Sequence, residues 1–324
     1  MLITGGAGFI GSHIVNALRR DMDVSVFIYD IKANNNKEGN TVSVPGDIFN
    51  SDLLTKVMKD HEVSSVVHMI GDPSIPSCQK NPNLSFRLNV LSVQNILEAM
   101  RLNDVGHLIF PSTASVYGKI NGVKASEDTL PNPTTVYGFH KLAAESLIKG
   151  YAEQYSLKPT ILRVFNVYGD LDKEQGVISL FIRRAFAHEP LIIKGGKQLR
   201  DFVELKDVVQ AFVKALTNAK VCENHVINVA SGVGLTISAI ADMIKQSFPQ
   251  VEVEYRPSES NEYSFSADVS CMKNLLKINP TDPGKGIPKF IEKCKSRNKY
   301  MKNETPANLV KSEIINSSSK QKAM

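Results

Sequence analysis

A tyrosine and a lysine stand four positions apart in the stretch Tyr137-Gly138-Phe139-His140-Lys141. On a helix this spacing places both side chains on one face, so a phenol and an ammonium group would lie close together. A free phenol titrates near 10, and its deprotonation near neutral pH requires stabilisation of the phenolate by about 4 kcal/mol. A neighbouring ammonium supplies part of that stabilisation. The pair predicts a general acid–base centre in which Tyr137 transfers a proton.

Upstream, a hydroxyl cluster follows the apolar run that ends at Phe110, in the stretch Pro111-Ser112-Thr113-Ala114-Ser115-Val116-Tyr117-Gly118. We expect a hydroxyl of this cluster to hold the oxygen that Tyr137 deprotonates. Either feature alone also arises by chance, because Ser-Thr runs are common in loops and this Tyr-Lys spacing occurs on many helices. Their occurrence together, in this order, favours a catalytic site.

Near the start, the chain reads Leu2-Ile3-Thr4-Gly5-Gly6-Ala7-Gly8-Phe9-Ile10-Gly11-Ser12, followed by apolar residues at helical spacing. A strand, a glycine turn and a helix in this arrangement bind a dinucleotide. Gly5 permits the tight turn, Gly8 lets the backbone approach a pyrophosphate, and Gly11 allows close packing of the helix. The positive end of the helix then faces the phosphates. The alternative is an ordinary turn.

A second predicted strand, from Val24 to Asp30, ends in a carboxylate 19 residues after Gly11. An acid at this place accepts hydrogen bonds from both adenosine ribose hydroxyls and repels the 2′-phosphate of NADP, so the pattern favours NAD. Lys32 leaves dual use open, and a simple turn role for Asp30 is the alternative. Lys141 would then also bond the nicotinamide ribose, and the positive nicotinamide ring would favour the phenolate of Tyr137.

Composition limits the other classes of function. The chain has 324 residues, 42% of them hydrophobic, and no stretch approaches the roughly 20 apolar residues of a membrane helix. The chain begins inside a predicted strand rather than in a charged leader, so we expect a cytoplasmic protein with no membrane partner. The net charge is +5, and the Lys and Arg residues are scattered along the chain. The scattering disfavours nucleic acid as a partner, and the mild positive charge suits an anionic substrate. The cysteines lack paired or metal-type spacing, so we expect free thiols and no metal site: Cys78, Cys222, Cys271 and Cys294.

Strand and helix patterns alternate through the first half of the chain, which predicts an α/β fold with a doubly wound parallel sheet of the Rossmann type. The expected strands are 24–30, 42–44, 63–68, 107–110 and 160–164, and the expected helices are 51–60, 85–103 and 134–155. After Tyr168 the pattern is less regular, with strands 191–193 and 251–255 and helices 204–218, 236–248, 267–277 and 287–295. We expect a smaller C-terminal substrate-binding domain there. The predicted boundaries are 1–165 and 203–231 for NAD binding, 166–202 and 232–296 for substrate binding, and 297–324 for a flexible tail.

From Leu2 to about Lys295 the chain resembles the extended short-chain dehydrogenase/reductases of the NAD-dependent epimerase/dehydratase family. The resemblance rests on the glycine segment, the Tyr137 and Lys141 pair and several further motifs. These are Gly46-Asp47-Ile48, Val67-His68-Met69-Ile70-Gly71, Asn89-Val90, Ser112-Thr113 through Tyr117-Gly118, Leu162-Arg163-Val164-Phe165-Asn166-Val167-Tyr168-Gly169 and Arg200-Asp201-Phe202-Val203.

The resemblance implies a role for each matching position. The catalytic triad is Thr113, Tyr137 and Lys141, with threonine where serine is commoner. The residues implied to bind NAD are Gly5, Gly8, Phe9, Ile10, Gly11, Asp30, Asp47, Ile48, Met69, Ile70, Gly71, Asn89, Tyr137, Lys141 and Phe165. The residues implied to bind the nucleotide sugar are Thr113, Asn166, Arg200 and Arg256, of which Asn166 and Arg200 match positions that bind the diphosphate. Asn166 could instead cap a turn and Asp47 the next helix.

The implied function is an NAD-dependent nucleotide-sugar epimerase that acts at C4 through a transient 4-keto sugar. Net oxidation or reduction of a nucleotide sugar by the same triad is an alternative, and an NAD-binding regulatory protein without turnover is an alternative of another class. The resemblance also implies a homodimer formed through the helices predicted near 85–103 and 134–155.

Three departures from the family pattern qualify this reading. Dehydratases carry Asp-Glu after the triad threonine, whereas this chain has Ala114-Ser115, so dehydration is not expected. Glu259 stands where a second arginine is usual after Arg256, and a carboxylate there would repel a diphosphate. Met1 lies inside the first apolar run, so we expect a short first strand.

Overall fold

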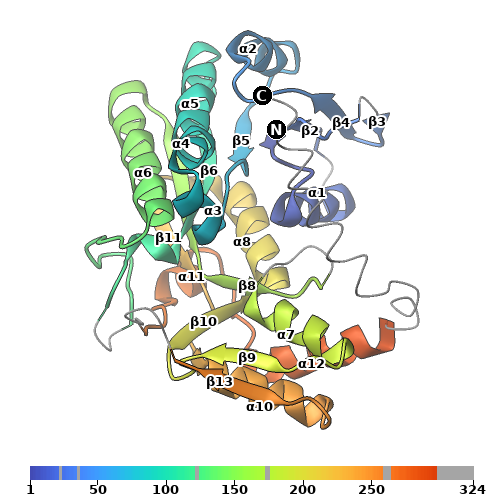
Figure 1. The fold of residues 1–324 in the computed structure, drawn as a ribbon. Helices are drawn as coiled ribbons and strands as arrows, with labels where there is room; N and C mark the ends of the chain where they lie inside the picture. The colour runs from blue at the N-terminus through green and yellow to red at the C-terminus, as the bar shows by residue number, and fades with distance from the viewer. Residues whose placement is uncertain (22–23, 35–36, 121–123, 172–175, 258–263, 298–324) are drawn as a thin grey trace.

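The structure is a computed structural model that describes residues 1–21, 24–34, 37–120, 124–171, 176–257 and 264–297. Its main feature is an eight-stranded sheet in the order β11-β7-β6-β5-β1-β2-β4-β3 (Figure 1). The strands are β1 Leu2–Thr4, β2 Val26–Asp30, β3 Lys37–Glu38, β4 Thr41–Pro45, β5 Ser65–His68, β6 His107–Thr113, β7 Lys158–Val164 and β11 His225–Val229. All neighbours in it pair in parallel except the short β3, which pairs antiparallel to β4.

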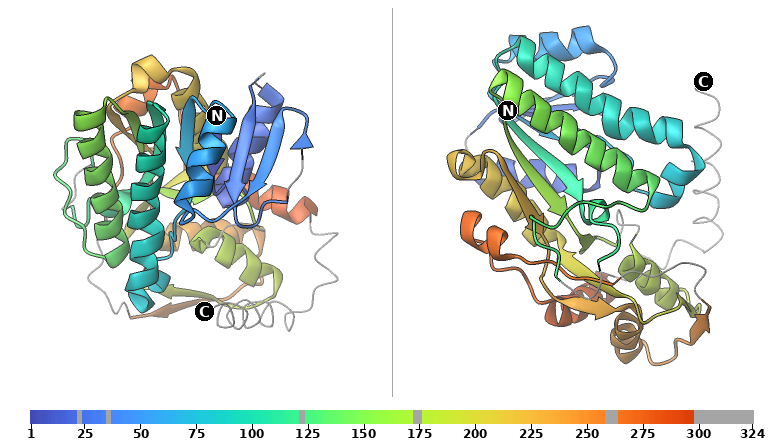
Figure 2. Two further views of the ribbon diagram at one scale, coloured as in Figure 1. Left: turned by 90° about the horizontal axis from the view of Figure 1, so that it is seen from above. Right: turned by 90° about the vertical axis from the view of Figure 1, so that its left-hand side faces the viewer.

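Helices cover both faces of this sheet, because consecutive side chains of a strand point to opposite faces and both faces are apolar. Ile3 joins a core with α1 Phe9–Asp21 and α8 Leu205–Thr217, whereas the adjacent Leu2 joins a second core with α2 Ser51–Asp60, α5 Ser92–Leu102 and α6 Val136–Tyr155. The two views of Figure 2 show these layers. The predicted α/β fold with a doubly wound parallel sheet is confirmed.

The second half of the chain adds two small sheets beside the carboxyl ends of the main strands (Figure 1). One contains β8 Asn166–Tyr168, β10 Leu199–Glu204 and β12 Gly234–Thr236, and the other contains β9 Leu191–Lys194 and β13 Val253–Arg256. A third apolar core joins them to α7 Val177–Phe186, α10 Ile237–Ser247 and α12 Pro283–Arg297. The remaining short elements are α3 Ile75–Lys80, α4 Pro82–Phe86, α9 Ala219–Cys222, α11 Ser270–Leu275 and the 3₁₀ turn Ala114–Val116.

Several elements differ from the sequence prediction. Strand β6 continues to Thr113, so Ser112 and Thr113 lie in the strand and not in the loop after it. The helix expected at 85–103 is α4, a π-helical turn Arg87–Leu91 and α5 in succession. Helix α12 begins at Pro283 and includes Arg297, the first residue of the predicted tail, whose remainder lies outside the described residues. The elements that were not predicted are strands β3, β8, β10, β11 and β12 and helices α3, α7 and α9.

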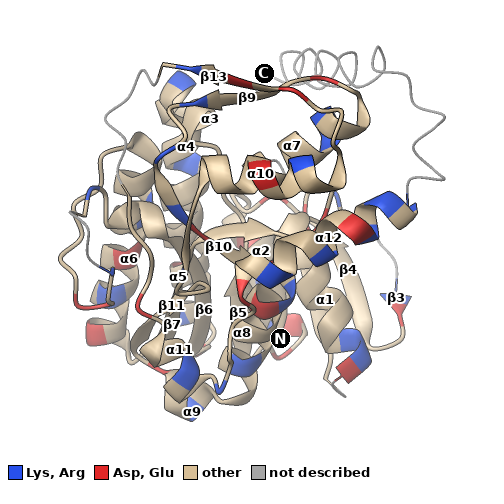
Figure 3. Ribbon diagram, turned by 90° about the horizontal axis from the view of Figure 1, so that it is seen from below, with Lys and Arg blue, Asp and Glu red and all other residues tan. Residues whose placement is uncertain are grey.

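Strand β1 has three residues, as the position of Met1 predicts. Cationic and anionic residues are interspersed over the helices drawn in Figure 3. Within the described residues, no helix combines the length and the apolar character that crossing a membrane requires.

Candidate active site

The glycine turn lies where the strand order reverses, since β1 has β2 on one side and β5 on the other. Ligands of doubly wound sheets bind at this point. Gly5 has a φ of +71°, and a Cβ on it would lie 2.9 Å from the backbone nitrogen of Ile70. A Cβ on Gly11 would lie 2.5 Å from the carbonyl oxygen of Gly5. Both predicted glycine requirements are confirmed, although Gly11 packs on the turn itself. Ala7 and Gly8 are exposed at its outer edge, directly before Phe9 begins α1.

Asp30 ends β2 beside this turn and is 8% exposed. One carboxylate oxygen accepts a hydrogen bond from the backbone N–H of Ala7 at 3.0 Å, and the other accepts one from the N–H of Lys32 at 2.8 Å. The second bond is a local turn, so the turn role weighed as an alternative is present. Each carboxylate oxygen has a further lone pair, and both can still accept a hydroxyl hydrogen bond.

The segment after β4 carries Asp47 and Ile48. The exposed Asp47 carboxylate accepts a hydrogen bond from the N–H of Phe49 at 3.0 Å, whereas Asn50 caps α2 through the N–H of Leu53 at 3.1 Å. The alternative in which Asp47 caps the helix is therefore wrong. Ile48 is 2% exposed, its side chain lies in the core, and its carbonyl oxygen accepts a hydrogen bond from the side-chain amide of Asn95 at 3.1 Å.

Asn89 holds the loop that follows β5. Its amide oxygen accepts a hydrogen bond from the N–H of Asp72, and its amide nitrogen donates one to the carbonyl oxygen of Asp72, both at 3.1 Å. The π-helical turn carries this buried side chain, and a Cβ on Gly71 would lie 2.7 Å from the Asn89 oxygen. Asn89 therefore sets the path of Met69, Ile70 and Gly71, which are partly or fully exposed.

Thr113 and Tyr137 meet at the carboxyl end of β6. Thr135 caps α6 by accepting a hydrogen bond from the N–H of Gly138 at 3.1 Å, which places Tyr137 in the first turn of the helix. Burial raises the pKa of Tyr137 to about 12, against the lowering effect of its hydrogen bond with the Thr113 hydroxyl. Nearby Cys78 and Asp72 raise this pKa further. The phenol is thus held in its protonated form.

Lys141 lies one turn further along α6 and is 4% exposed. Its ammonium nitrogen is 3.9 Å from the centroid of the Phe110 ring, and among the described residues it donates no hydrogen bond. Burial lowers the pKa of Lys141 to about 7, although the Glu145 carboxylate acts in the opposite direction. The pKa of Tyr137 is thus raised and not lowered here, and its lowering in the presence of Lys141 and NAD stays a prediction.

These features fit a dinucleotide. The exposed backbone at Ala7 and Gly8 stands at a helix N-terminus, where phosphates bind. The Asp30 carboxylate retains lone pairs for ribose hydroxyls. The buried Lys141 ammonium lacks hydrogen-bond acceptors within the described structure, and a buried charge of this kind is costly unless a ligand supplies them.

The structure brings two of the predicted substrate residues together. Asn166 on β8 pairs with Phe202 on β10, and its amide donates a hydrogen bond to the carbonyl oxygen of Asp201 at 2.9 Å, next to Arg200. The amide of Asn166 therefore bonds a distant strand and not only a local turn. Arg256 lies on β13, and its exposed guanidinium pairs with Glu254 at 2.9 Å. Glu259 lies outside the described residues.

Other predicted positions are buried. The Phe165 ring is 6% exposed and packs 5.9 Å from the centroid of Phe265, and Ile10 packs partly buried against the core below α1. Phe9 contacts His13 edge-on, with ring centroids 6.1 Å apart.

Sequence reasoning missed the roles of His68 and of Glu145, the partner of Arg163. His68 is fully buried, bonded to the Thr4 hydroxyl at 2.7 Å and the Ser92 hydroxyl at 3.2 Å, and burial lowers its pKa to about 3. Glu145 and Arg163 form a buried ion pair at 2.8 Å. The available signal was the position of Glu145 four residues after Lys141, which puts this charge on the buried face of α6.

Known proteins share this architecture over almost the whole chain. A UDP-glucose 4-epimerase of Corynebacterium glutamicum is 30% identical over 264 residues, covering 76% of this chain and 79% of that protein. The crystal structure of a UDP-glucose 4-epimerase of Thermotoga maritima with UDP-glucose superposes with a TM-score of 0.83 at 28% identity, covering 91% of this chain and 98% of that one. A UDP-glucuronic acid 4-epimerase of Bacillus cereus, in complex with UDP-glucuronic acid and NAD, superposes with a TM-score of 0.80 at 28% identity, covering 90% and 99%.

The family model that matches the chain spans residues 1–230, which include the glycine turn, the Thr113, Tyr137 and Lys141 cluster, and the β8 and β10 pair. The resemblance drawn from the motifs is thereby confirmed. On these grounds the chain belongs to the NAD dependent epimerase/dehydratase family.

Proposed function

We propose that this protein is an NAD-dependent nucleotide-sugar epimerase that inverts C4 through a transient 4-keto sugar. The observation that carries the proposal is the meeting of three groups at one edge of the sheet. The Thr113 hydroxyl bonds the Tyr137 phenol, and the Lys141 ammonium lies one helical turn away. A purely regulatory NAD-binding protein has no need of this arrangement.

Tyr137 is the general base and acid in this proposal. As phenolate it takes the proton of the sugar hydroxyl, while Thr113 donates a hydrogen bond to the same oxygen. NAD, when bound, supplies a hydride acceptor that can return the hydride, and a positive charge that favours the phenolate. Tyr137 then gives the proton back to the oxygen of the inverted alcohol. Lys141 orients the reaction by bonding the ribose hydroxyls that satisfy its ammonium.

The remaining site residues are proposed from position and chemistry. Backbone groups of the turn would hold the pyrophosphate, Asp30 the adenosine ribose, and Asp47 with the Ile48 backbone the adenine. The full set proposed for NAD is Gly5, Gly8, Phe9, Ile10, Gly11, Asp30, Asp47, Ile48, Met69, Ile70, Gly71, Asn89, Tyr137, Lys141 and Phe165. Asn166, Arg200 and Arg256 would bind the diphosphate, since guanidinium groups offer paired donors to phosphate.

We also propose the division of labour that the sequence suggested. Residues 1–165 and 203–231, which include all strands of the large sheet, would bind NAD. Residues 166–202 and 232–296, which include the two small sheets except for the last two residues of β10, would bind the nucleotide sugar. UDP-glucose and UDP-glucuronic acid, the nucleotide sugars in the Thermotoga and Bacillus structures, are the first candidates.

The experiment is a substrate panel. The purified protein is incubated with UDP-, GDP-, CDP- and dTDP-sugars, products are identified by NMR, and absorbance is followed in the NADH band. Formation of the C4 isomer without net NADH supports the epimerase. NADH in proportion to substrate would instead indicate a dehydrogenase, and tight NAD binding without turnover would indicate a regulatory protein.

A homodimer is proposed through the outer face of α5 and α6, which faces the viewer in the right-hand view of Figure 2. Large apolar side chains are exposed on these helices and on the adjoining α4: Phe86 (42%), Leu102 (56%), Phe139 (57%) and Tyr155 (54%). Exposed apolar patches of this kind mark interfaces. Light scattering of the wild type and of Phe139→Glu/Leu102→Glu tests this, and a monomeric wild type would refute it.

The cytoplasm is proposed as the site of action. All four cysteines are free thiols and three of them are buried, a usage typical of reducing compartments.

A further inference from the structure

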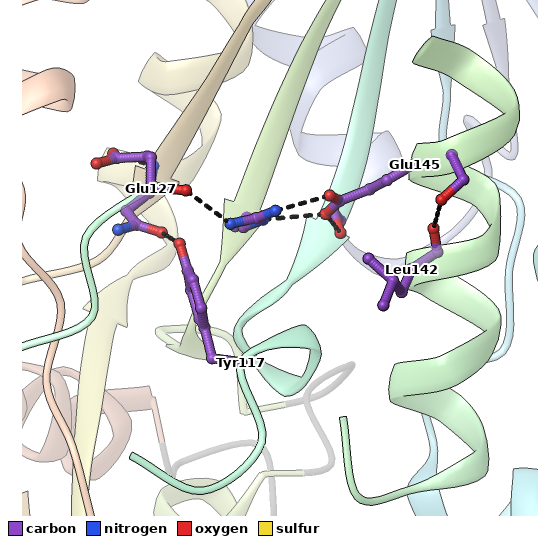
Figure 4. A network of polar contacts seen from close by, with 8 residues as sticks. Tyr117, Glu127, Leu142 and Glu145 are labelled. Atoms are coloured by element: carbon purple, nitrogen blue, oxygen red, sulfur yellow. Dashed lines mark hydrogen bonds and ion pairs between the residues drawn. The ribbon is translucent and has the colours of Figure 1, made fainter. Parts of the chain in front are cut away.

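The carboxylate of Glu145 is fully enclosed and bonded through both oxygens (Figure 4). Oε1 accepts two hydrogen bonds, one from the Ser112 hydroxyl at 2.5 Å and one from Nε of Arg163 at 3.1 Å. The second oxygen accepts one from Nη2 of Arg163 at 2.8 Å. The Arg163 side chain is 2% exposed. This is a two-point, charge-assisted contact, the most direction-dependent kind of polar contact a carboxylate makes.

The three residues belong to the three elements that carry or flank the catalytic groups. Ser112 directly precedes Thr113 on β6, and Glu145 follows Lys141 by one turn of α6. Arg163 lies on β7, where its neighbour in the sheet register is Ser112. The contact therefore ties the helix of the phenol and the ammonium to the strand of the threonine.

The other contacts of α6 with the sheet do not fix its position along the helix axis as tightly. The neighbouring buried residues, Ala144 and Ile148, are apolar and belong to the second core. Apolar contacts depend weakly on direction, whereas a bidentate pair loses its hydrogen bonds when either partner moves by a fraction of an ångström. Among the described residues, the Glu145 contact and the Thr113–Tyr137 hydrogen bond are the direction-dependent contacts of α6 with β6, and only the Glu145 contact is bidentate.

Arg163 is itself held on its far side (Figure 4). Its Nη1 donates to the carbonyl oxygen of Glu127 at 3.3 Å, and its guanidinium lies 4.8 Å from the centroid of the Tyr117 ring. The Tyr117 hydroxyl donates to the side-chain oxygen of Asn228 at 2.7 Å, and the Asn228 N–H donates to the Glu127 carboxylate at 2.8 Å. The arginine is therefore a fixed anchor for Glu145.

We propose that Glu145 is a positioning residue for catalysis, which through Ser112 and Arg163 sets the distance of Tyr137 and Lys141 from Thr113. The inference rests on the proposed function for its activity readout. Stability alone is a poor reason for the pair, because a buried ion pair costs desolvation that apolar residues of similar volume avoid. The two explanations differ in what happens when both charges are removed together.

The decisive variant is the double replacement Glu145→Leu/Arg163→Met, which removes both charges and keeps the volume. Glu145→Gln alone leaves the arginine buried and unpaired, so it is expected to unfold more easily. The double variant is expected to recover the unfolding midpoint of the wild type, because no uncompensated charge remains. Its kcat is expected to stay at least about tenfold below that of the wild type with KM little changed, since misplacement of reacting groups slows the chemical step.

A milder variant and a matched control complete the set. Ser112→Ala removes one hydrogen bond to Glu145 and is expected to lower kcat by a smaller factor in the same sense. Ser146→Ala is the control, because this exposed hydroxyl lies next to Glu145 on α6 and donates only to the Leu142 carbonyl at 3.0 Å (Figure 4). Its kcat and KM should match those of the wild type. A double variant that recovers kcat together with stability would overturn the proposal.

A second readout does not depend on turnover. In ¹³C-tyrosine-labelled protein, the Tyr137 signal is assigned by its loss in Tyr137→Phe. The double variant and Ser112→Ala are expected to shift this signal, because the contact with Thr113 changes, and Ser146→Ala is expected to leave it in place. If the wild type turns over no nucleotide sugar, the proposed function fails, and an unshifted Tyr137 signal in the double variant separately refutes the positioning role.

Discussion

Replacement of the buried Lys141 by methionine should stabilise the protein without cofactor while abolishing its activity. The ammonium is 4% exposed, lies against the Phe110 ring and lacks a hydrogen-bond acceptor among the described residues. A charge held in this way disfavours the folded state, and methionine fills a similar volume without the charge. A site residue kept at the expense of stability is a common feature of enzymes.

The size of the effect follows from the pKa of Lys141, which burial lowers from 10.5 to about 7. Below pH 7 the folded protein must carry a proton that it holds less tightly than the unfolded chain, a cost of about 5 kcal/mol, or about 4 kcal/mol at pH 7. Loss of the contact between the ammonium and the Phe110 ring offsets about 1–2 kcal/mol of the gain. The net stabilisation expected for Lys141→Met at pH 7 is about 2–3 kcal/mol.

The pH dependence of the unfolding free energy tests independently whether the Lys141 ammonium destabilises the folded protein. Between pH 7 and 10.5 the unfolded chain binds more protons at this group than the folded protein, so the stability of the wild type rises with pH across this window. The variant lacks this rise, and its advantage should vanish near pH 10.

The assay is urea unfolding of cofactor-free protein at several pH values from 6 to 10. Lys149→Met, on an exposed position of the same helix, is the control and should leave the unfolding free energy within about 0.5 kcal/mol of the wild type. The reasoning is refuted if Lys141→Met is no more stable than the wild type at pH 7, or if its advantage persists unchanged at pH 10.

Three further predictions concern the cofactor, the chemistry and the core. Tyr137→Phe should lower kcat by about 10²–10⁴-fold with NAD still bound, measured by product NMR and cofactor content; undiminished epimerisation would rule out the proposed base. Asp30→Ala should weaken NAD binding by about 1.5–3 kcal/mol in calorimetry, because charged hydrogen bonds are lost, and unchanged affinity would contradict the ribose role. Burial lowers the pKa of His68 to about 3, so the unfolded chain takes up a proton that the folded protein does not, and the wild type loses about 2 kcal/mol of stability between pH 6.5 and 4.5; His68→Asn should abolish most of this loss in urea titrations, and an equal loss would refute the assignment.

The local parts of the fold were predictable because they depend on neighbours in the sequence. The positions of Gly5 and Gly11 follow from a turn whose backbone leaves no room for a side chain, and the structure confirms both. The spacing of Tyr137 and Lys141 predicts a shared helix face wherever the helix lies. The alternation of strands and helices likewise predicts the parallel sheet, since parallel neighbours require helical connections.

The predicted boundaries of helices and strands were wrong where tertiary contacts outweigh the local sequence pattern. Strand β6 runs on through Ser112 and Thr113 because β7 continues to pair with it, and β11 escaped detection because it joins the sheet edge only through distant β7. Asp47 was a candidate for the N-cap of α2, but the N-cap is Asn50. The Asp47 carboxylate instead accepts a hydrogen bond from the N–H of Phe49 in the turn before the helix.

By itself the sequence determined the class of fold, the dinucleotide turn and the choice of the proposed catalytic groups, because each is encoded in residue types at short, regular spacing. Only the tertiary structure decided the electrostatic state of those groups. Burial holds Tyr137 protonated and weakens the proton affinity of Lys141, contrary to the expectation from their spacing. The tertiary structure also decided that the Glu145 carboxylate is hydrogen-bonded to Arg163 and Ser112. Desolvation and pairing depend on residues far apart in the chain, which no local pattern records.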